Sequence, residues 1–342
     1  MNLSELTRIS NCGFLIKGFK YLTGLEVKPR MLRYVLAAQA LKAFSLNSAT
    51  KRLYRTLGNR LGGRARGKGL PAHYLSRADR NLAQLERVGA IRDGLRIMEI
   101  GTGWVHWEAL FVRCFYEVDV VLMDVWDNRQ FGGFKAYAAE LCRRLDETLR
   151  SADQKLRARE LLRSIAQCTC FDEVYDLLGF RYILGVENAY GAIGDGELDA
   201  IFSSDVLEHV PATTIPQMSK EHIRILKPGG VSFHQVVPSD HLCIYDHQVN
   251  SKNYLRYSDA AWNLFFANDV QYVNRIQMSE WARLFEEAGF EVECRPTASV
   301  DVSSLKIADR FSRLPPSDLG VTVFHLMARK PTQVSQSTHP LE

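Results

Sequence analysis

The chain has 342 residues, of which 46% are hydrophobic and 24% are charged. This composition predicts one main globular domain with a large core, plus extensions. No run of eighteen apolar residues and no signal-peptide pattern occurs, so we expect a cytoplasmic protein that neither spans a membrane nor is secreted. The net charge of +4 hides an asymmetry, because residues 1–70 carry +12 and the other 272 residues carry −8.

The seven cysteines are scattered along the chain, which is typical of reduced thiols in a cytosolic protein. Cys168 and Cys170 are separated by one residue, but no second Cys/His pair stands at zinc-like spacing. The cysteines therefore predict neither a disulfide framework nor a metal site.

Residues 1–70 are predicted to form a basic helical N-terminal extension. Met31–Leu46 is predicted to be helical, and Lys51–Lys68 has seven basic residues, four glycines and no acid. Three interpretations remain open for this region. The first is a helical cap on the main domain with a solvated basic linker. The second is a segment that binds an anionic membrane surface or an anionic lipid-linked substrate. The third is a segment that binds nucleic acid. Nucleic acid is the least favoured of the three.

The segment Leu95–Val105, LRIMEIGTGWV, indicates a strand that runs into a glycine loop and then a helix. The dinucleotide fingerprint needs a third glycine or alanine, and His106 stands in that place after Gly101 and Gly103. A pyrophosphate cradle is therefore not expected. Glu99, two residues before the first glycine, suits a cofactor that carries positive charge and an ammonium group, and S-adenosylmethionine has both.

A second strand is predicted within Val118–Asp127. Asp124 at its end stands about 20 residues after the glycine loop, where nucleotide-binding parallel sheets place an acid that binds the ribose hydroxyls. A helical insertion at about residues 134–178 then precedes a third strand near Phe180–Val186. It is longer than the one crossover helix that a parallel sheet needs. We expect an elongated helical hairpin on the sheet edge in preference to a substrate lid.

Two further segments follow in order. Leu198–Pro211, LDAIFSSDVLEHVP, reads as a strand, a Ser/Asp cluster and then Glu208 and His209. In Ile225–Val237, ILKPGGVSFHQVV, a Pro-Gly-Gly turn leads into another strand.

With these motifs in this order, the chain resembles the class I S-adenosylmethionine-dependent methyltransferases over roughly Ala72–Pro331. EIGTGWV resembles their first motif except for its usual third glycine, which is Val105 here, and SDVLEHV and LKPGG resemble their fourth- and fifth-strand regions. The resemblance implies a Rossmann-like, doubly wound α/β fold. Its seven-stranded sheet carries helices on both faces, and its last strand is antiparallel. Met278–Pro296 and Val321–Ala328 suit the final helix and strands.

The resemblance also implies S-adenosylmethionine as the cofactor, bound at the carboxyl ends of the first strands. Its expected binding residues are Glu99, Gly101, Thr102, Gly103, Asp124, Ser203, Ser204 and Asp205.

The loops after the fourth and fifth strands border the methyl end of the cofactor in this topology. A hydroxyl acceptor benefits from a base, and histidine suits that task near neutral pH. We select His241 as the base, with His209 and Asp240 as further catalytic candidates. Asp246 could orient His241, or Asp240 could orient His247. The spacing of these acids and histidines matches no metal motif, so no metal is predicted.

The segment Asn250–Trp281 is dense in aromatic residues with Asn and Arg between them. This loosely resembles bacterial methyltransferases of cell-surface glycan pathways, because aromatic faces and polar groups together can hold a sugar. Trp262, Phe265 and Phe266 have helix-core spacing and are expected to be buried, whereas Asn274-Arg275 remains open.

The sequence thus predicts a methyltransferase domain over residues 71–330 and a disordered tail over 331–342. The favoured reaction is O-methylation of a small-molecule or glycan-like acceptor. The alternatives are a non-catalytic S-adenosylmethionine-binding protein and a membrane-surface or nucleic-acid-binding protein that acts through its N-terminus.

Overall fold

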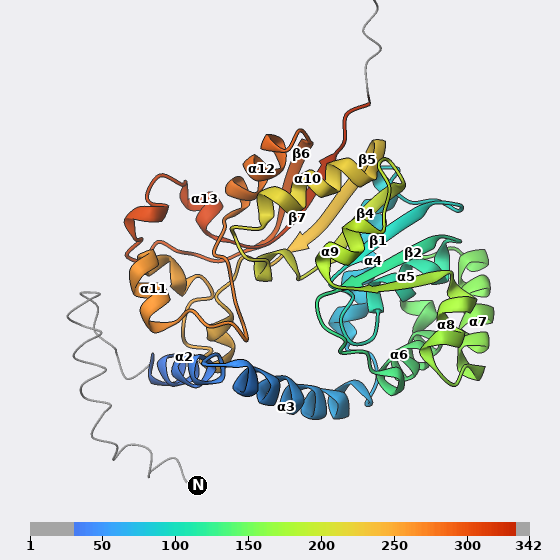
Figure 1. Cartoon of the computed structure of the whole chain (residues 1–342), viewed down its shortest axis with the longest axis horizontal. Helices are drawn as coiled ribbons and strands as arrows, with labels where there is room; N and C mark the ends of the chain where they lie inside the picture. Colours follow the sequence, from blue (N-terminus) through green and yellow to red (C-terminus); the bar gives the residue numbers. More distant parts are fainter. Residues whose placement is uncertain (1–30, 333–342) are drawn as a thin grey trace, which may run out of the picture.

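The computed structural model describes residues 31–332, so the predictions for residues 1–30 and for most of the tail lie outside it. Its centre is a seven-stranded sheet in the order β3-β2-β1-β4-β5-β7-β6 (Figure 1). Strands β1 to β5 pair in parallel, whereas β7 is antiparallel to both β5 and β6. The strands are β1 (Arg96–Ile100), β2 (Asp119–Asp124), β3 (Phe180–Leu184), β4 (Leu198–Ser204), β5 (Leu226–Val236), β6 (Glu291–Ser299) and β7 (Val321–Arg329). The predicted methyltransferase-type sheet is confirmed.

Helices cover both faces of the sheet, because β1, β2 and β4 are apolar on both sides. One face carries α4 (Ala72–Arg87), α5 (Trp107–Phe115), α6 (Phe131–Arg144), α7 (Ala152–Gln167) and α8 (Phe171–Leu178). The other carries α9 (Val186–Gly191), α10 (Ile215–Ile225) and α12 (Met278–Glu287).

The helical insertion differs from the expected hairpin on the sheet edge. It consists of the three helices α6, α7 and α8, joined in part by the 3₁₀ turn η3 (Leu145–Glu147). Helix α7 packs against α5 and α6, because Ala158, Leu162 and Ile165 enter the core of that face. The insertion therefore builds one face of the domain.

A third apolar cluster lies beyond the carboxyl end of β5 and contains the start of the N-terminal extension. Tyr34, Ala38 and Leu41 of α2 (Leu32–Phe44) are buried against residues that include Tyr254 and Trp262. The other elements here are η5 (His241–Tyr245), η6 (Asn253–Arg256), α11 (Asp259–Phe265), η7 (Asp309–Phe311) and α13 (Pro316–Leu319). We call this unit the cap. The extension and the cap share one core.

The aromatic residues predicted to be helix core lie in the cap. Trp262 and Phe266 are buried, and Phe265 packs against the cluster partly buried. These rings stabilise the cap and are not free to stack on a sugar.

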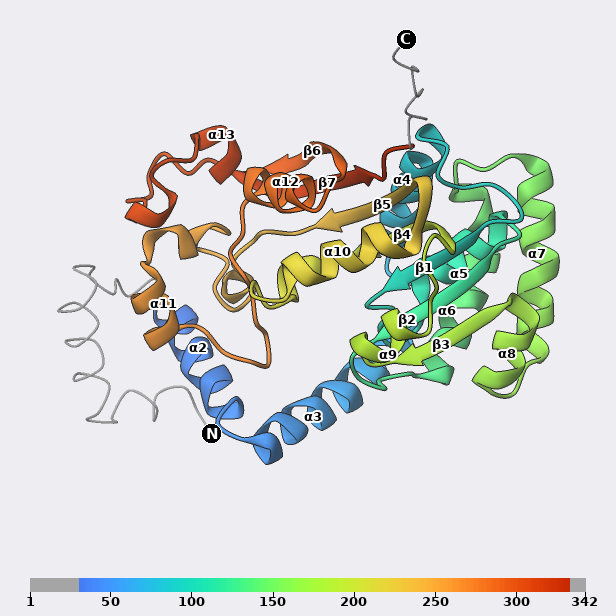
Figure 2. The same cartoon turned by 45° about the horizontal axis from the view of Figure 1, so that its top comes forward.

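Helix α3 (Ser48–Arg66) runs from the cap to the side of the sheet that carries α6 (Figure 2). It begins with a capping box in which Asn47 and Thr50 each accept the other's backbone N–H. No helix within residues 31–332 is both long enough and apolar enough to cross a membrane.

Candidate functional site

The glycine loop after β1 requires both of its glycines. Gly101 and Gly103 have φ values of 68° and 64°, in the left-handed region that disfavours side chains. A Cβ on Gly101 would also lie 2.6 Å from Cγ2 of Val206, which follows β4. The space beside Gly103 is open, because among the described residues, its two chain neighbours aside, no atom lies closer than 3.9 Å to a Cβ built there. The loop thus leaves room for a ligand beside its second glycine.

Asp124 stands at the end of β2 and joins this strand to the glycine loop. Its Oδ2 accepts a hydrogen bond of 2.8 Å from the N–H of Gly103, and its Oδ1 accepts from Val125 and Trp126. A carboxylate oxygen can accept two hydrogen bonds, so Oδ2 keeps capacity for one hydroxyl. Burial raises the pKa of Asp124, while the bond from Gly103 lowers it. These features suit the predicted contact with ribose.

Glu99 lies buried beneath the same loop. It accepts hydrogen bonds from Thr102 Oγ1 at 3.0 Å and from the N–H of Ala109 at 3.2 Å. Burial, and then the charge of Glu108, raise the pKa of Glu99 to about 8. A cation bound close by would favour its ionised form. Glu99 therefore both supports the loop and suits a positively charged ligand.

His106 occupies the position of the third glycine of the dinucleotide fingerprint, and its buried ring supports the glycine loop through Thr102. It is fully buried, with Nδ1 at 2.7 Å from Thr102 Oγ1 and Nε2 at 2.8 Å from the hydroxyl of Tyr175 on α8. Because Thr102 donates its proton to Glu99, His106 donates to Thr102 through Nδ1 and accepts from Tyr175 through Nε2. The sequence pattern marked His106 only as an exception to a motif and gave no sign of Tyr175.

The three predicted cofactor residues at the end of β4, of which Ser203 and Ser204 belong to the strand, are all engaged within the protein. Ser203 is buried, 2.7 Å from Nδ1 of His234, and Ser204 accepts from Asn81. Asp205 has a φ of 58°, and its carboxylate accepts from Arg77 at 2.6 Å and from Gln235 at 2.7 Å. The side chain of Asp205 is 36% exposed, so it is more accessible to a ligand than the buried Ser203.

The predicted acceptor loops do come together. His209 ends the 3₁₀ turn η4 (Leu207–His209) after β4, and His241 begins η5 after β5. Their rings meet edge to face with centroids 4.9 Å apart. One ligand atom each of His209, His241 and Glu208 lies within 4.8 Å of the others. We call these three residues the acceptor cluster.

Burial sets the charge of the acceptor cluster. It lowers the pKa of His209, and with the neighbouring His209 it lowers the pKa of His241 to about 4. The imidazole of His241 is therefore neutral at pH 7. Burial, and then the charge of Asp205, raise the pKa of Glu208. The backbone N–H groups of Glu208 and Val237 oppose that rise only in part, and neither makes a well-formed hydrogen bond to its carboxylate.

Asp240, the third catalytic candidate, lies outside the acceptor cluster. Its buried carboxylate accepts from the hydroxyl of Tyr34 at 2.7 Å and from the N–H of Leu242 at 3.1 Å. Among the described contacts it has no hydrogen bond to His241 or His247. Asp240 therefore holds α2 of the extension to η5, and a direct catalytic role for it has no support in these contacts.

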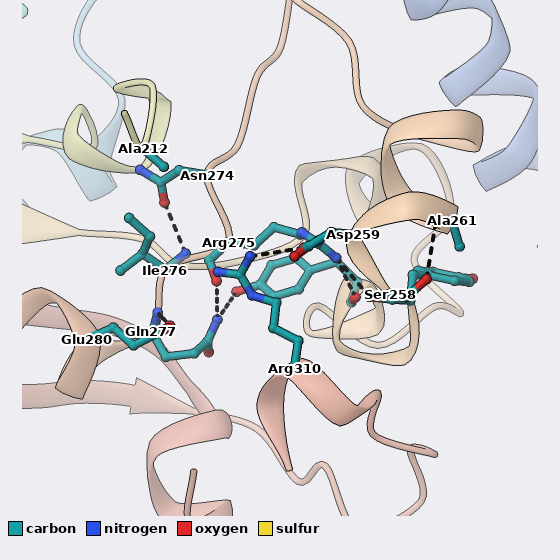
Figure 3. A network of polar contacts seen from close by, with 12 residues as sticks. Ala212, Ser258, Asp259, Ala261, Asn274, Arg275, Ile276, Gln277, Glu280 and Arg310 are labelled. Atoms are coloured by element: carbon teal, nitrogen blue, oxygen red, sulfur yellow. Dashed lines mark hydrogen bonds and ion pairs between the residues drawn. The ribbon is translucent and has the colours of Figure 1, made fainter. Parts of the chain in front are cut away.

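Asn274 and Arg275, to which the sequence assigned no role, make contacts that stabilise the fold (Figure 3). The amide of Asn274 donates to the carbonyls of Leu207 and Val210 at 2.8 and 3.1 Å, so it clamps the η4 turn. Arg275, with a φ of 61°, is buried and paired with Asp259. Neither side chain is free to bind a sugar.

Helix α3 contacts both the loops after β1 and β2 and the cap. Arg55 stacks on Trp126 after β2 at 3.9 Å, and Asn59 accepts from the indole N–H of Trp104 in the glycine loop at 2.7 Å. Near the start of α3, the hydroxyl of Tyr54 accepts from Gln271 of the cap at 2.7 Å. The basic segment is therefore a helix packed over the loops of the site.

Three solved structures to which this chain shows limited similarity are the following. The phosphoethanolamine N-methyltransferase 2 of Haemonchus contortus, in complex with S-adenosylmethionine, is 16% identical with a TM-score of 0.43. The match covers 74% of this chain and only 52% of the Haemonchus chain, about half of its length.

A methyltransferase of Methanosarcina mazei is 17% identical with a TM-score of 0.40, over 72% of this chain and 96% of its own. One of Archaeoglobus fulgidus is 12% identical with a TM-score of 0.38, over 72% and 92%. Both are described as dependent on S-adenosylmethionine.

In sequence, no curated protein matches the chain. A family model described as a methyltransferase domain matches residues 71–295, which is most of the domain that contains the glycine loop, Asp124 and the acceptor cluster. The chain therefore belongs to the methyltransferase-domain family and has its Rossmann-like fold.

Proposed function

We propose that this protein transfers a methyl group from S-adenosylmethionine to an oxygen of a small-molecule or glycan-like acceptor. One relationship carries the proposal. The hydrogen bond from Gly103 to Asp124 ties together the ends of β1 and β2, while His209 and His241 lie beyond the ends of β4 and β5. Carboxyl ends of parallel strands meet at one edge of a sheet, where ligands of doubly wound folds bind.

The roles follow from this arrangement. Asp124 would accept a ribose hydroxyl, and Glu99 would offset the positive charge of the cofactor. The sulfonium makes the methyl group electrophilic, so positioning the acceptor in line with it is the main task of the protein. The acceptor hydroxyl must also lose its proton, and the neutral imidazole of His241 is the group we selected for this.

Polar groups of the cap support a hydroxyl-rich acceptor. Gln271 donates to the hydroxyls of Tyr54 and Tyr245 at 2.7 and 2.8 Å, while its own Oε1 is buried without a hydrogen-bond partner among the described residues. Tyr272, the next residue, accepts from His209 through its carbonyl. An acceptor with hydroxyl groups would satisfy Gln271 Oε1 if it displaced the groups that cover this oxygen, one residue along the chain from the contact of Tyr272 with His209.

Calorimetric titration of the full chain with S-adenosylmethionine, S-adenosylhomocysteine and NAD tests the cofactor. We expect micromolar binding of the first two and none of NAD. Binding of NAD alone would overturn the proposal. A screen of hydroxylated acceptors, read out as S-adenosylhomocysteine formed, then tests the reaction. Cofactor binding without turnover across the screen would favour the non-catalytic alternative.

We also propose that the outer face of α3 rests on an anionic membrane surface. Leu53, Leu57 and Leu61 follow one another at four-residue spacing and are 51%, 42% and 65% exposed. Arg52, Arg60 and Arg64 are exposed on the same helix. Exposed apolar and basic side chains together are typical of helices that lie in a membrane interface.

Co-sedimentation with vesicles tests this contact. We expect binding to phosphatidylcholine vesicles that contain phosphatidylglycerol and little binding to phosphatidylcholine alone. A variant with Leu53, Leu57 and Leu61 replaced by serine should lose binding, while replacing exposed Leu156 of α7 should not. Equal binding to both vesicle types, or binding to nucleic acid only, would contradict it. A cytoplasmic location remains part of this proposal, and the six described cysteines, all free thiols, support it.

A further inference from the structure

The acceptor cluster has the composition of a metal site. Two imidazoles and one carboxylate are a ligand set of catalytic zinc sites, which keep a further position open for water or substrate. The three ligand atoms lie within 4.8 Å of one another. Ligands of a tetrahedral zinc ion lie about 3.4 Å apart. Small side-chain rotations of His241 and Glu208 would therefore bring all three onto one ion.

Glu208 supplies an independent sign of a ligand. Its side chain is 1% exposed, and neither carboxylate oxygen has a hydrogen-bond partner among the described residues. An unsatisfied buried carboxylate is expensive, so such a group in a native fold calls for a partner. His209 and His241 lie beside it, and neither they nor the nearby N–H of Val237 make a well-formed hydrogen bond to it among the described residues, whereas an ion held by all three side chains would satisfy it.

The surroundings of His209 orient it as a ligand. Its Nδ1 lies 2.6 Å from the carbonyl oxygen of Tyr272, which can only accept, so the ring proton is on Nδ1. The lone pair is then on Nε2. A ligating histidine usually donates its other ring N–H to a carbonyl or carboxylate in this way. Asn274 fixes the same turn through the carbonyls of Leu207 and Val210.

We propose that Glu208, His209 and His241 bind one divalent transition-metal ion of the zinc type, whose open position takes the acceptor oxygen. This deepens the proposed function and rests on it for the reaction, although not for metal binding itself, and it gives His241 the role of a metal ligand in place of that of a base. Asp205, with its side chain paired to Arg77 and Gln235, lies close enough to add negative charge near the ion.

The chemistry follows from the charge of the ion. An acceptor hydroxyl bound to it loses its proton to bulk water more readily, because the cation stabilises the alkoxide. The oxygen then attacks the methyl carbon, and the carbon–sulfur bond breaks with its electron pair left on sulfur. Neutral S-adenosylhomocysteine leaves, and the charge balances. His241 then serves as a ligand, and its lone pair is not available to act as a base.

The test uses the full chain after its metal has been removed with EDTA and dialysis. This protein is titrated with Zn²⁺, followed by calorimetry, and with Co²⁺, followed by visible absorbance. We expect one ion per chain and a Co²⁺ spectrum typical of nitrogen and oxygen ligands. Glu208→Gln, which preserves shape, and His241→Ala should each weaken binding by about 100-fold or more, which exceeds the usual effect of second-shell changes. The matched control is His247→Ala, an exposed histidine six residues after His241.

S-adenosylmethionine titrations of the same samples separate the two proposals. Cofactor binding without metal binding, or metal binding that Glu208→Gln leaves unchanged, would overturn the metal site and return His241 to the role of base. Metal binding without cofactor binding would support the site and contradict the proposed reaction. Circular dichroism of each variant shows whether a loss reflects unfolding.

Discussion

His106 Nε2 lies 2.8 Å from the hydroxyl of Tyr175, and this contact ties the helical insertion to the glycine loop. The relay continues from His106 to Thr102 and from Thr102 to Glu99. Burial, followed by the charge of Arg129, lowers the pKa of His106 to about 3, so the ring stays neutral and keeps its lone pair for Tyr175. The insertion therefore helps to hold the loop that is expected to bind the cofactor.

Tyr175→Phe should weaken the cofactor site from a distance. Removal of the hydroxyl leaves His106 Nε2 buried without a donor, which costs about 1–3 kcal/mol of folding stability. We expect a lower urea midpoint and weaker binding of S-adenosylhomocysteine. Tyr182→Phe is the control, because the one hydrogen bond of the Tyr182 hydroxyl within residues 31–332 is a long 3.4 Å contact to the carbonyl of Trp126. Equal effects of the two variants would contradict the relay.

Asp124→Ala should weaken cofactor binding by about 1–3 kcal/mol, the typical result of losing a charged hydrogen-bond acceptor. The bond from Gly103 is lost together with the expected ribose contact. Calorimetric titration with S-adenosylmethionine measures the change. Asp127→Ala, which removes an exposed carboxylate paired with Arg129, should bind almost normally. Unchanged affinity of Asp124→Ala would remove Asp124 from the site.

His241→Ala should lower turnover by about 10²–10⁴-fold, the range expected for a group that assists proton transfer. Cofactor affinity should be unchanged, because His241 lies in the acceptor cluster beyond β5 and is not one of the residues expected to bind the cofactor. Initial rates at saturating cofactor, together with titration of the cofactor, separate the two quantities. A fully active variant would leave both the base and the metal ligand without support.

Arg77→Met should destabilise the fold by about 3–5 kcal/mol, because breaking a buried pair leaves an uncompensated charge. The guanidinium of Arg77 is 2.7 Å from the carboxylate of Glu108, whose side chain is 8% exposed. Adding Glu108→Gln should restore much of the lost stability by removing the stranded charge. Urea denaturation of the single and double variants gives the comparison. A double variant no more stable than Arg77→Met would show that the charge is not the cause.

Lys252 should make stability depend on pH. It is fully buried, donates to Pro238 O and Gln277 Oε1 at 2.7 Å each, and burial lowers its pKa to about 7 from an ordinary 10.5. Between these two values the unfolded chain binds one proton more than the folded chain. The free energy of unfolding should therefore rise with pH in that window, by at most about 1.4 kcal/mol per pH unit.

Below about pH 7 the buried ammonium of Lys252 lowers the free energy of unfolding by its full amount. This destabilisation decreases as the pH rises toward 10.5. Lys252→Met should remove this slope while keeping a side chain of similar length. Urea midpoints of both proteins at several pH values across the window provide the measurement. Parallel curves would show that Lys252 titrates normally in the folded state.

The sequence predicted the sheet well, because its signals are local. The apolar runs of β1, β2 and β4, the glycines with positive φ and the Pro-Gly-Gly turn before β5 each depend on a few neighbouring residues. The meeting of His209 and His241 also followed from strand order. Ser203 was selected by its position at the end of a strand and Asp240 by its position in a loop. Both side chains instead contact partners inside the protein.

Contacts between distant segments were beyond such signals. Tyr175 lies 69 residues after His106, and Tyr34 lies 206 residues before Asp240. No spacing rule links such pairs, since burial and packing select them only when the chain is folded. The same holds for Asn274, whose clamp on η4 spans more than sixty residues.

The sequence by itself determined the methyltransferase-type sheet, the glycine loop and Asp124, because strand periodicity and backbone conformation are encoded by adjacent residues. Only the tertiary structure decided that the basic segment covers the site loops and that a cap completes the acceptor side. It also buried the carboxylate of Glu208 beside His209 and His241, with no hydrogen-bond partner among the described residues. These features depend on which side chains from distant segments are buried against one another, and that is determined only when the whole chain has packed.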